Sequence, residues 1–306
     1  MVYAIIAAVA VASVLLITYL CYILTFYSDR SIPQEEYPVP KGKIYEPYRE
    51  QIINWIKQLR QMPHEDVEIT SFDGLKLRGR YFEYSPDAPV ELMFHGYRGT
   101  SEKDLSGGVH RCFQLGHSAL LVDQRACGMS EGNKITFGIL ESRDCHSWIE
   151  FARAHFGPER KLILCGISMG AATVLMAAGK ELPPNVVGVL ADCGYTSPRE
   201  IIRKVIRQIK LPPAILYPFV RLAARMFAGF DLEADSPLEA VTRCQVPVIF
   251  FHGDRDDFVP LDMSRRNFEA CIAPKRLVTV PGAGHGLSYS VQPQEYLQAL
   301  REFFEE

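Results

Sequence analysis

The stretch Leu162-Ile163-Leu164-Cys165-Gly166-Ile167-Ser168-Met169-Gly170-Ala171-Ala172 decides the fold that this sequence predicts. It is an apolar run that ends in Gly-x-Ser-x-Gly and continues into small residues, which indicates a strand, a sharp turn and a helix. A serine at the tip of such a turn takes a strained backbone conformation, and only a very small residue fits two positions before it and two positions after it. Gly166 and Gly170 occupy those positions. A buried strand followed by a glycine-tolerant loop would give the same letters, so the rest of the chain must separate the two interpretations.

Short apolar runs alternate with helix-length segments beyond Pro89. These runs are near-continuous, which is typical of strands that are buried on both faces of a mainly parallel sheet. Two β-rich runs come before them on either side of Asp73-Gly74, a hairpin signal, so we expect an antiparallel pair at the sheet edge. The predicted strands are Val67–Phe72, Leu75–Tyr84, Val90–Phe94, Ala119–Asp123, Lys161–Cys165, Val186–Ala191, Val246–Phe251 and Leu277–Val280.

Chemically active side chains follow several of these runs. In a parallel sheet, ligands bind outside the carboxyl ends of the strands. Three acids, Asp254, Asp256 and Asp257, follow the run that ends at residue 251, and His285 follows the run that ends at residue 280. Together with Ser168 they give the chain order Ser, Asp, His.

The sequence resembles the α/β-hydrolase superfamily from about Val67 to the C-terminus, especially its esterase, monoglyceride-lipase-like and prolyl-oligopeptidase-like branches. This resemblance implies an α/β-hydrolase fold: a mainly parallel eight-stranded sheet with an antiparallel N-terminal hairpin, helices on both faces and a helical cap after the sixth strand. One departure is Ala126, where the family has glycine; it affects a turn and leaves the chemistry untouched. Besides Ser168, the motifs are His95-Gly96-Tyr97-Arg98-Gly99, Asp123-Gln124-Arg125-Ala126-Cys127-Gly128-Met129-Ser130, the Asp-x-x-Val-Pro of Asp256 to Pro260, and Gly284-His285.

The resemblance also implies catalytic roles. Ser168 is the expected nucleophile, and His285 takes its proton during the attack and returns it to the leaving group. Asp256 holds the imidazole in the productive tautomer. The backbone N–H groups of Tyr97 and Met169 are the expected oxyanion hole. No metal and no organic cofactor is expected.

Other residues compete for these roles. Asp254 and Asp257 are alternatives to Asp256 as the acid, and only the Asp-x-x-Val-Pro register favours Asp256. Asp192 follows another strand, although its surroundings also predict a capped turn. For the remaining polar residues at strand ends we expect structural roles: His95, His252 and Arg125.

The N-terminus predicts a membrane anchor. Residues 1–28 carry no charged side chain and are almost wholly apolar from Val2 to Tyr27. About twenty such residues at ~1.5 Å each span a ~30 Å hydrocarbon core. The basic start and the small-residue cleavage site of a signal peptide are not evident, so a cleaved signal or a buried core helix is the alternative. We expect an anchor over residues 1–28, a proline-containing linker over 29–43 and a catalytic domain over 44–306. Basic residues follow the span, which places that domain in the cytoplasm by the positive-inside rule: Arg30, Lys41, Lys43 and Arg49.

A segment from about residue 195 to 244 is too long for a plain crossover, and we expect it to form the cap. Its first part combines an apolar stripe (Ile201, Ile202, Val205, Ile206 and Ile209) with basic residues mostly on the opposite side (Arg203, Lys204, Arg207 and Lys210). Either the cap covers its own pocket, or this amphipathic surface lies on the bilayer and admits lipid-like esters.

Composition excludes several classes of protein. The net charge is -3, from 33 basic and 36 acidic residues without long runs of either sign, which is not the pattern of a nucleic-acid binder. The eight cysteines are scattered without a Cys-x-x-Cys pair, so we expect buried free thiols, neither a disulfide framework nor a zinc site, and a reducing compartment.

The motifs and the resemblance together predict a serine hydrolase that cleaves carboxylic esters. A serine peptidase or an acyltransferase would use the same triad, and a non-catalytic binding protein would have no need of all three residues.

Overall fold

The computed structural model describes residues 1–30 and 35–304, and its centre is an eight-stranded sheet in the order β1-β2-β4-β3-β5-β6-β7-β8. From β4 to β8 every neighbouring pair is parallel, whereas β1–β2 and β2–β4 are antiparallel. The mainly parallel sheet with an antiparallel N-terminal hairpin is therefore confirmed. The strands are β1 (Glu65–Thr70), β2 (Lys76–Phe82), β3 (Val90–Phe94), β4 (Ser118–Val122), β5 (Leu162–Ile167), β6 (Val186–Asp192), β7 (Val248–Gly253) and β8 (Lys275–Val280).

The hairpin differs from the prediction in two ways. Of the two hairpin strands only β1 lies at the edge of the sheet, because β2 also pairs with β4. The turn is longer than Asp73-Gly74 alone: the N–H of Ser71 donates to the carbonyl oxygen of Leu75 at 2.8 Å, and the Ser71 hydroxyl bonds Asp73. These bonds remove residues 71–75 from the ladder, so β1 ends at Thr70. Gly74 has a φ of +92°, which explains the glycine.

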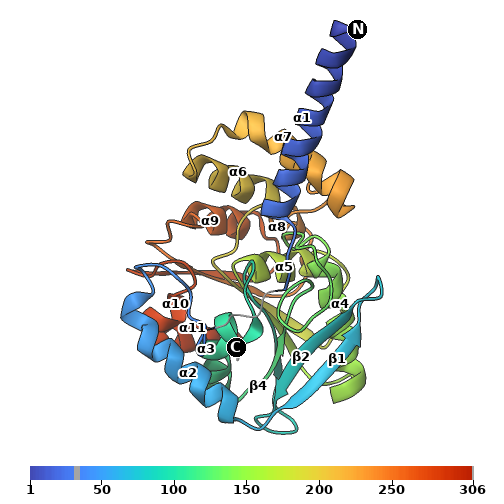
Figure 1. Ribbon diagram of the computed structural model, residues 1–306. Helices are drawn as coiled ribbons and strands as arrows, with labels where there is room; N and C mark the ends of the chain where they lie inside the picture. The colour runs from blue at the N-terminus through green and yellow to red at the C-terminus, as the bar shows by residue number, and fades with distance from the viewer. Residues whose placement is uncertain (31–34, 305–306) are drawn as a thin grey trace.

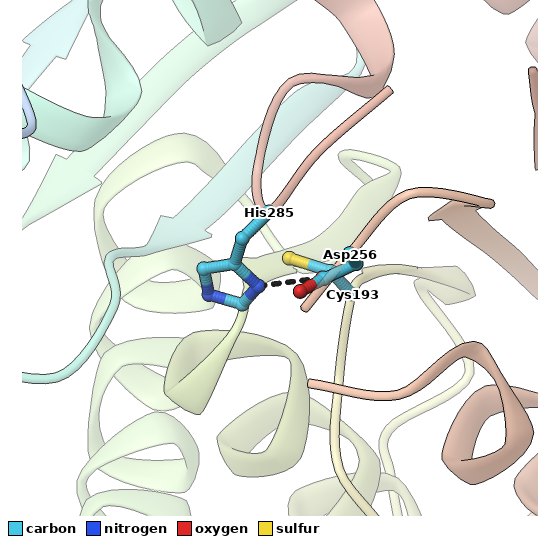
Figure 2. A group of neighbouring side chains, drawn as sticks. All are labelled: Cys193, Asp256 and His285. Atoms are coloured by element: carbon cyan, nitrogen blue, oxygen red, sulfur yellow. Dashed lines mark hydrogen bonds and ion pairs between the residues drawn. The ribbon is translucent and has the colours of Figure 1, made fainter. Parts of the chain in front are cut away.

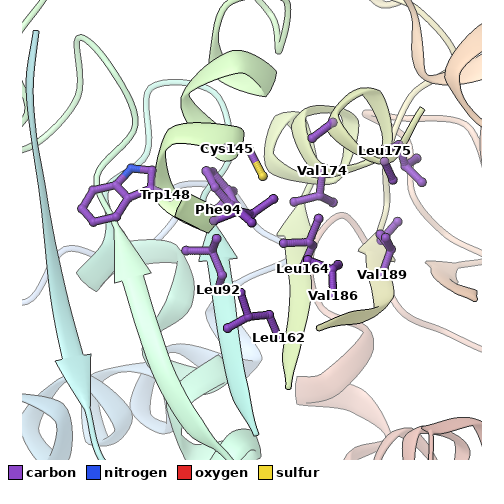
Figure 3. Close-up of a cluster of buried hydrophobic side chains, with 14 of the residues drawn as sticks. Leu92, Phe94, Cys145, Trp148, Leu162, Leu164, Val174, Leu175, Val186 and Val189 are labelled. Carbon is purple, nitrogen blue, oxygen red and sulfur yellow. The ribbon is translucent and has the colours of Figure 1, made fainter. Parts of the chain in front are cut away.

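Helices cover both faces of the sheet (Figure 1). On one face, α4 and α5 pack on β3 and β5 through Trp148, Val174 and the strand residues Leu92 and Leu164 (Figure 3). Each such side chain contributes roughly 1.5–3 kcal/mol when it is fully buried. On the other face, α3 and α11 contribute a second core. The helices of these two layers are α2 (Arg49–Gln61), α3 (Ser101–Gln114), α4 (Glu141–Phe156), α5 (Met169–Ala178), α8 (Pro237–Ala240), α9 (Leu261–Ala270), α10 (Ser288–Val291) and α11 (Pro293–Phe304), with the short helix η1 (Glu46–Tyr48) before α2.

The predicted cap is a helical insertion between β6 and β7. It contains α6 (Pro198–Gln208), α7 (Pro213–Ala223) and the π-helical turn η2 (Ala224–Ala228). The apolar stripe of α6 faces the protein, because Ile201, Ile202 and Ile206 are buried, whereas Ile209 is exposed. Lys204 is occupied as well: its ammonium donates to the carbonyl oxygens of Asp257 and Phe258. These contacts favour the interpretation that α6 covers its own domain.

The N-terminal apolar segment forms the helix α1 (Val2–Thr25), which extends away from the sheet and passes beside α7 (Figure 1). By length and composition it could cross a membrane, and a signal sequence would pass the same test. The first part is exposed, but Thr18, Cys21, Tyr22 and Phe26 are buried, and the last three share a cluster with residues of the cap. The last part of the apolar segment is therefore packed into the folded domain.

The segment that we predicted as a linker, residues 29–43, is described only in part, since residues 31–34 lie outside the described residues. Its later portion packs on the domain, because Val39 is buried together with Ile52, Trp55 and Ile56 of α2. Residues 35–48 thus cross the surface of the domain before α2 begins.

Candidate active site

Ser168 stands in the sharp turn between β5 and α5. Its backbone angles are φ 56° and ψ -115°, a strained conformation for a residue with a side chain. A Cβ atom on Gly166 would lie 2.2 Å from the carbonyl carbon of Gly170, and one on Gly170 would lie 2.0 Å from the carbonyl oxygen of Phe94. Both glycines are required by close backbone contacts, as the Gly-x-Ser-x-Gly pattern predicts.

The structure brings Ser168, His285 and Asp256 together beyond the carboxyl ends of β5, β8 and β7. Nε2 of His285 lies 2.9 Å from Oγ of Ser168, and Nδ1 of His285 lies 2.7 Å from Oδ2 of Asp256. A carboxylate beside Nδ1 favours the tautomer that carries its proton there. Nε2 is then free to accept the proton of the serine hydroxyl.

The carboxylate of Asp256 is buried and extensively hydrogen-bonded. Its Oδ1 accepts from the backbone N–H groups of Phe258 and Val259 at 2.9 and 2.8 Å. Its Oδ2 lies 3.2 Å from Nε2 of His252 as well as beside His285. Burial raises the pKa of the Asp256 carboxyl, but the hydrogen bonds to His252 and His285 lower it more, so the pKa falls below its usual value. Asp256 is therefore ionised at neutral pH.

The competing acids lie elsewhere. Asp254 accepts from the N–H of Gly282 at 2.7 Å, and the side chain of Asp257 is exposed. Asp192 accepts from the hydroxyls of Ser288 and Tyr296 at 2.9 and 3.2 Å, and burial raises its pKa to about 6. Of the candidate acids, Asp256 is the one in contact with His285.

The two amides predicted for the oxyanion hole flank the serine. Met169 is the first residue of α5, where a backbone N–H has no acceptor within the helix. Tyr97 lies in the loop after β3 and lines the same cavity as Ser168. Within the described part of the chain, neither amide donates a hydrogen bond to another protein group. Both N–H groups are therefore available to a ligand oxygen.

A cavity of about 270 Å³ opens beside Ser168 and His285. It extends away from the serine between α2 and α3, where Trp55, Met93 and Leu105 line it. Gly107 makes room there, because a Cβ at this position would lie 2.7 Å from the Trp55 ring. The apolar part of this cavity suits a hydrocarbon group attached to the reacting carbonyl.

Three contacts around the site had no signal in the sequence. The hydroxyl of Tyr45 donates to the carbonyl oxygen of His285 at 3.0 Å. The hydroxyl of Tyr97 donates to the carbonyl oxygen of Thr25 at 2.8 Å, and the guanidinium of Arg98 donates to that of Tyr27 at 2.9 Å. The N-terminal segments thus contact both the histidine loop and the loop after β3.

The polar residues with expected structural roles are internally satisfied. Nε2 of His95 accepts from the N–H of Gln124 at 3.0 Å, and Arg125 pairs with Asp144 at 2.6 Å. Ala126, the departure from the family pattern, adopts a φ of +61°, the left-handed conformation that favours glycine. The turn accommodates alanine at some conformational cost.

Cys193, Asp256 and His285 form a group whose potential metal-ligand atoms lie within 4.8 Å of one another (Figure 2). Burial raises the pKa of the Cys193 thiol well above its usual value, so the sulfur is protonated. The Asp256 carboxylate and Nδ1 of His285 already bond each other. A metal ion here would have to break that bond and deprotonate the thiol, so the arrangement does not fit a metal. The cysteines are free and buried, as expected.

Comparisons with known proteins identify the family and the fold of this chain. Residues 92–299 match the profile described as "Alpha/beta hydrolase family". The chain is 26% identical over 251 residues to YqkD of Bacillus subtilis, an uncharacterised protein, covering 81% of this chain and 82% of YqkD. The structure of the present chain is similar to that of the esterase Pf2001 of Pyrococcus furiosus, with a TM-score of 0.68 and 21% identity. The match covers 91% of this chain and 97% of Pf2001. It is also similar to Est1E of Butyrivibrio proteoclasticus, solved with ferulic acid, with a TM-score of 0.60, 21% identity, and coverage of 78% and 97%.

Proposed function

Because this chain belongs to the α/β hydrolase family, we propose that it is a serine hydrolase that cleaves carboxylic esters through an acyl intermediate on Ser168. The observation that supports this proposal most directly is the continuous hydrogen-bonded path from the Ser168 hydroxyl through His285 to Asp256. A serine hydroxyl is a weak nucleophile near neutral pH, and such a path supplies the base that it needs.

The reaction follows from the tautomer of His285 that carries its proton on Nδ1, beside Asp256. His285 takes the hydroxyl proton on Nε2 while Oγ of Ser168 attacks the ester carbonyl, and Asp256 stabilises the imidazolium. The N–H groups of Tyr97 and Met169 bond the oxyanion. His285 then protonates the departing alcohol as its C–O bond breaks. A water molecule then attacks the carbonyl of the acyl-serine while His285 takes its proton. His285 returns the proton to Oγ of Ser168, and the carboxylic acid is released.

The expected substrate is an ester with an apolar acyl group, because part of the cavity beside Ser168 is lined by apolar side chains: Ile52, Trp55, Met93 and Leu105. We further propose that α1 remains attached and holds the enzyme at a membrane, with the catalytic domain in the cytoplasm. The burial of Thr18, Tyr22 and Phe26 supports retention, since cleavage after the apolar segment would remove side chains from a packed core. An ester that resides in the membrane is then within reach.

A series of p-nitrophenyl esters tests this function. Wild type in detergent is expected to release a burst of p-nitrophenol equal to the enzyme concentration, followed by slower turnover, because the acyl-serine forms before it is hydrolysed. Ser168→Ala should give neither phase. Matched anilides and added alcohols separate the peptidase and acyltransferase alternatives. A non-catalytic binding protein would show no release from any substrate.

A further inference from the structure

Helix α7 carries an apolar stripe that faces outward. Ile215 and Leu222 of α7 and Met226 of the adjoining turn η2 are 65%, 36% and 51% exposed, and they recur at helical spacing on one side. The other side of the same helix is buried through Tyr217, Val220 and Ala223. Two sides of α7 are therefore apolar, and only one of them is covered by this domain.

Helix α7 lies next to α1. Helices α1 and α7 are in contact, and Tyr22 of α1 and Phe26, which follows the helix, share a buried cluster with Val220 and Ala223 of α7. The ring of Tyr19 meets that of Phe227, with centroids 5.5 Å apart and an angle of 75° between the planes. Figure 1 shows the two helices side by side where α1 leaves the domain. The stripe therefore belongs to the helix on which α1 packs as it leaves the domain.

The length of α1 sets the depth at which α7 lies. Every residue of α1 from Val2 to Ile17 is exposed, and from Thr18 onward one side of the helix is buried against the domain while Leu20 and Leu24 stay exposed. Sixteen helical residues extend about 24 Å, which is shorter than a hydrocarbon core of about 30 Å. The remaining ~6 Å of apolar thickness must then enclose the turns of α1 that pack on α7. A tilt of α1 would increase this overlap.

Arginines line the groove on the next side of α7. A groove of about 400 Å³ lies between α6 and α7. Among the described residues, the acidic side chains that pair with its arginines are Glu233 and Asp231. Glu233 lies 3.7 Å from Arg199 and 3.2 Å from Arg221, and it is shared between them. Asp231, 2.7 Å from Arg225, is the partner of a further arginine. The arginines that line the groove are Arg199, Arg203, Arg221 and Arg225.

We propose that α7 lies in the boundary layer of an anionic lipid leaflet, with its apolar stripe among the acyl chains and the arginine groove at the level of the lipid phosphates. An interfacial helix has this division between an apolar side and a basic side. Each arginine near an anionic surface adds to the attraction between the protein and the lipid. The proposal rests on the proposed entry of α1 into a bilayer and does not depend on the hydrolase activity. The membrane position of α7 and the ester hydrolysis can therefore fail separately.

Depth-dependent fluorescence quenching tests the proposal on the full chain in vesicles. An environment-sensitive label is placed on Ile215→Cys, which is practical because the native cysteines are buried. Val11→Cys on α1 reports entry of the anchor. Ile272→Cys is the matched control: Ile272 is also 65% exposed, but it precedes β8 and lies at the opposite end of that strand from His285. Lipids with a quencher on the acyl chain are mixed into phosphatidylcholine vesicles with or without phosphatidylglycerol.

The expected result is strong quenching at positions 11 and 215 and none at 272. Phosphatidylglycerol should increase the quenching at position 215 at least twofold. The double variant Arg203→Gln with Arg225→Gln should lose that increase. Millimolar inorganic phosphate should leave the increase unchanged. Quenching at 11 but not at 215 overturns the proposal, as does a label at 215 that is shielded by a second copy of the chain. An unchanged signal with phosphatidylglycerol, or its loss to free phosphate, overturns the assignment of the groove to lipid headgroups. Absence of quenching at 11 would overturn the membrane anchor itself.

Discussion

The hydroxyl of Tyr97 donates a hydrogen bond of 2.8 Å to the backbone carbonyl oxygen of Thr25, the last residue of α1. The final carbonyls of a helix have no N–H partner within it, so this bond satisfies one of them, and Arg98 satisfies another through Leu24 at 3.2 Å. The positive charge of Arg98 is also favourable at a helix C-terminus. The end of the apolar helix is thus joined to the loop that carries one predicted oxyanion donor.

Tyr97→Phe removes this bond and keeps the ring that stacks on Phe137. A lost hydrogen bond costs about 1 kcal/mol, so we expect kcat for ester hydrolysis to fall roughly fivefold with KM nearly unchanged, because the oxyanion donor acts mainly in the transition state. Steady-state kinetics measures both constants. Tyr84→Phe, at an exposed position, is the control and should match wild type. An unchanged kcat in Tyr97→Phe would mean that the loop does not depend on the end of α1.

Phe26→Ala should destabilise the domain. Phe26 is 0% exposed and lies between the rings of Phe137 and Phe230, with centroids 6.0 and 5.4 Å away. Truncation of a fully buried phenylalanine costs about 3–5 kcal/mol in unfolding free energy. Leu24→Ala, at a position 73% exposed, is the matched control and should change little. Chemical denaturation in detergent compares the two; equal stabilities would show that the end of α1 is not part of the core.

Asp256→Asn should lower kcat by a factor on the order of 10⁴, because an asparagine favours the wrong histidine tautomer. Asp257→Asn changes the same kind of side chain one residue further on, where it is exposed, and should stay within a few-fold of wild type. The ester assay distinguishes the two variants directly. If Asp257→Asn were the more damaging, the acid would be wrongly assigned.

The buried Asp192 predicts a pH dependence of stability. Its pKa is raised to about 6, so between about pH 4 and pH 6 the folded protein binds a proton that the unfolded chain has released. Stability from this group is complete below pH 4 and falls as the pH rises through 6, by roughly 3 kcal/mol in total. The unfolding free energy of wild type minus that of Asp192→Asn should therefore decrease from pH 4 to pH 7. A constant difference would show that Asp192 titrates normally.

The sheet could be predicted from the sequence because its strands are short, apolar and regularly spaced. Val90–Phe94 matches β3 at both ends, and the other parallel strands shift by one or two residues at their ends. The hairpin turn was less predictable, because the side chain of Ser71 competes with the ladder for hydrogen bonds. The position of β2 inside the sheet follows from pairing with β4, which a local pattern does not encode.

The candidate site was predictable where a motif fixes a turn, as it does for Ser168 and His285. Among the three neighbouring acids, only the register separated Asp256 from Asp254 and Asp257. Contacts between distant segments carried no local signal: Tyr45 with His285, and Tyr97 with Thr25, join residues 240 and 72 positions apart. For α1, the composition predicted a helix, whereas its buried end depends on packing against the cap.

Labelling with a fluorophosphonate probe tests the central claim, that Ser168 is an activated nucleophile, most directly. Wild type and Ser168→Ala are compared at equal concentration in detergent, with circular dichroism to establish that both are folded, and the labelled peptide is identified by mass spectrometry. We predict stoichiometric labelling of wild type on Ser168 and none of the variant. Labelling that persists in Ser168→Ala, or a folded wild type that does not react, would contradict the account.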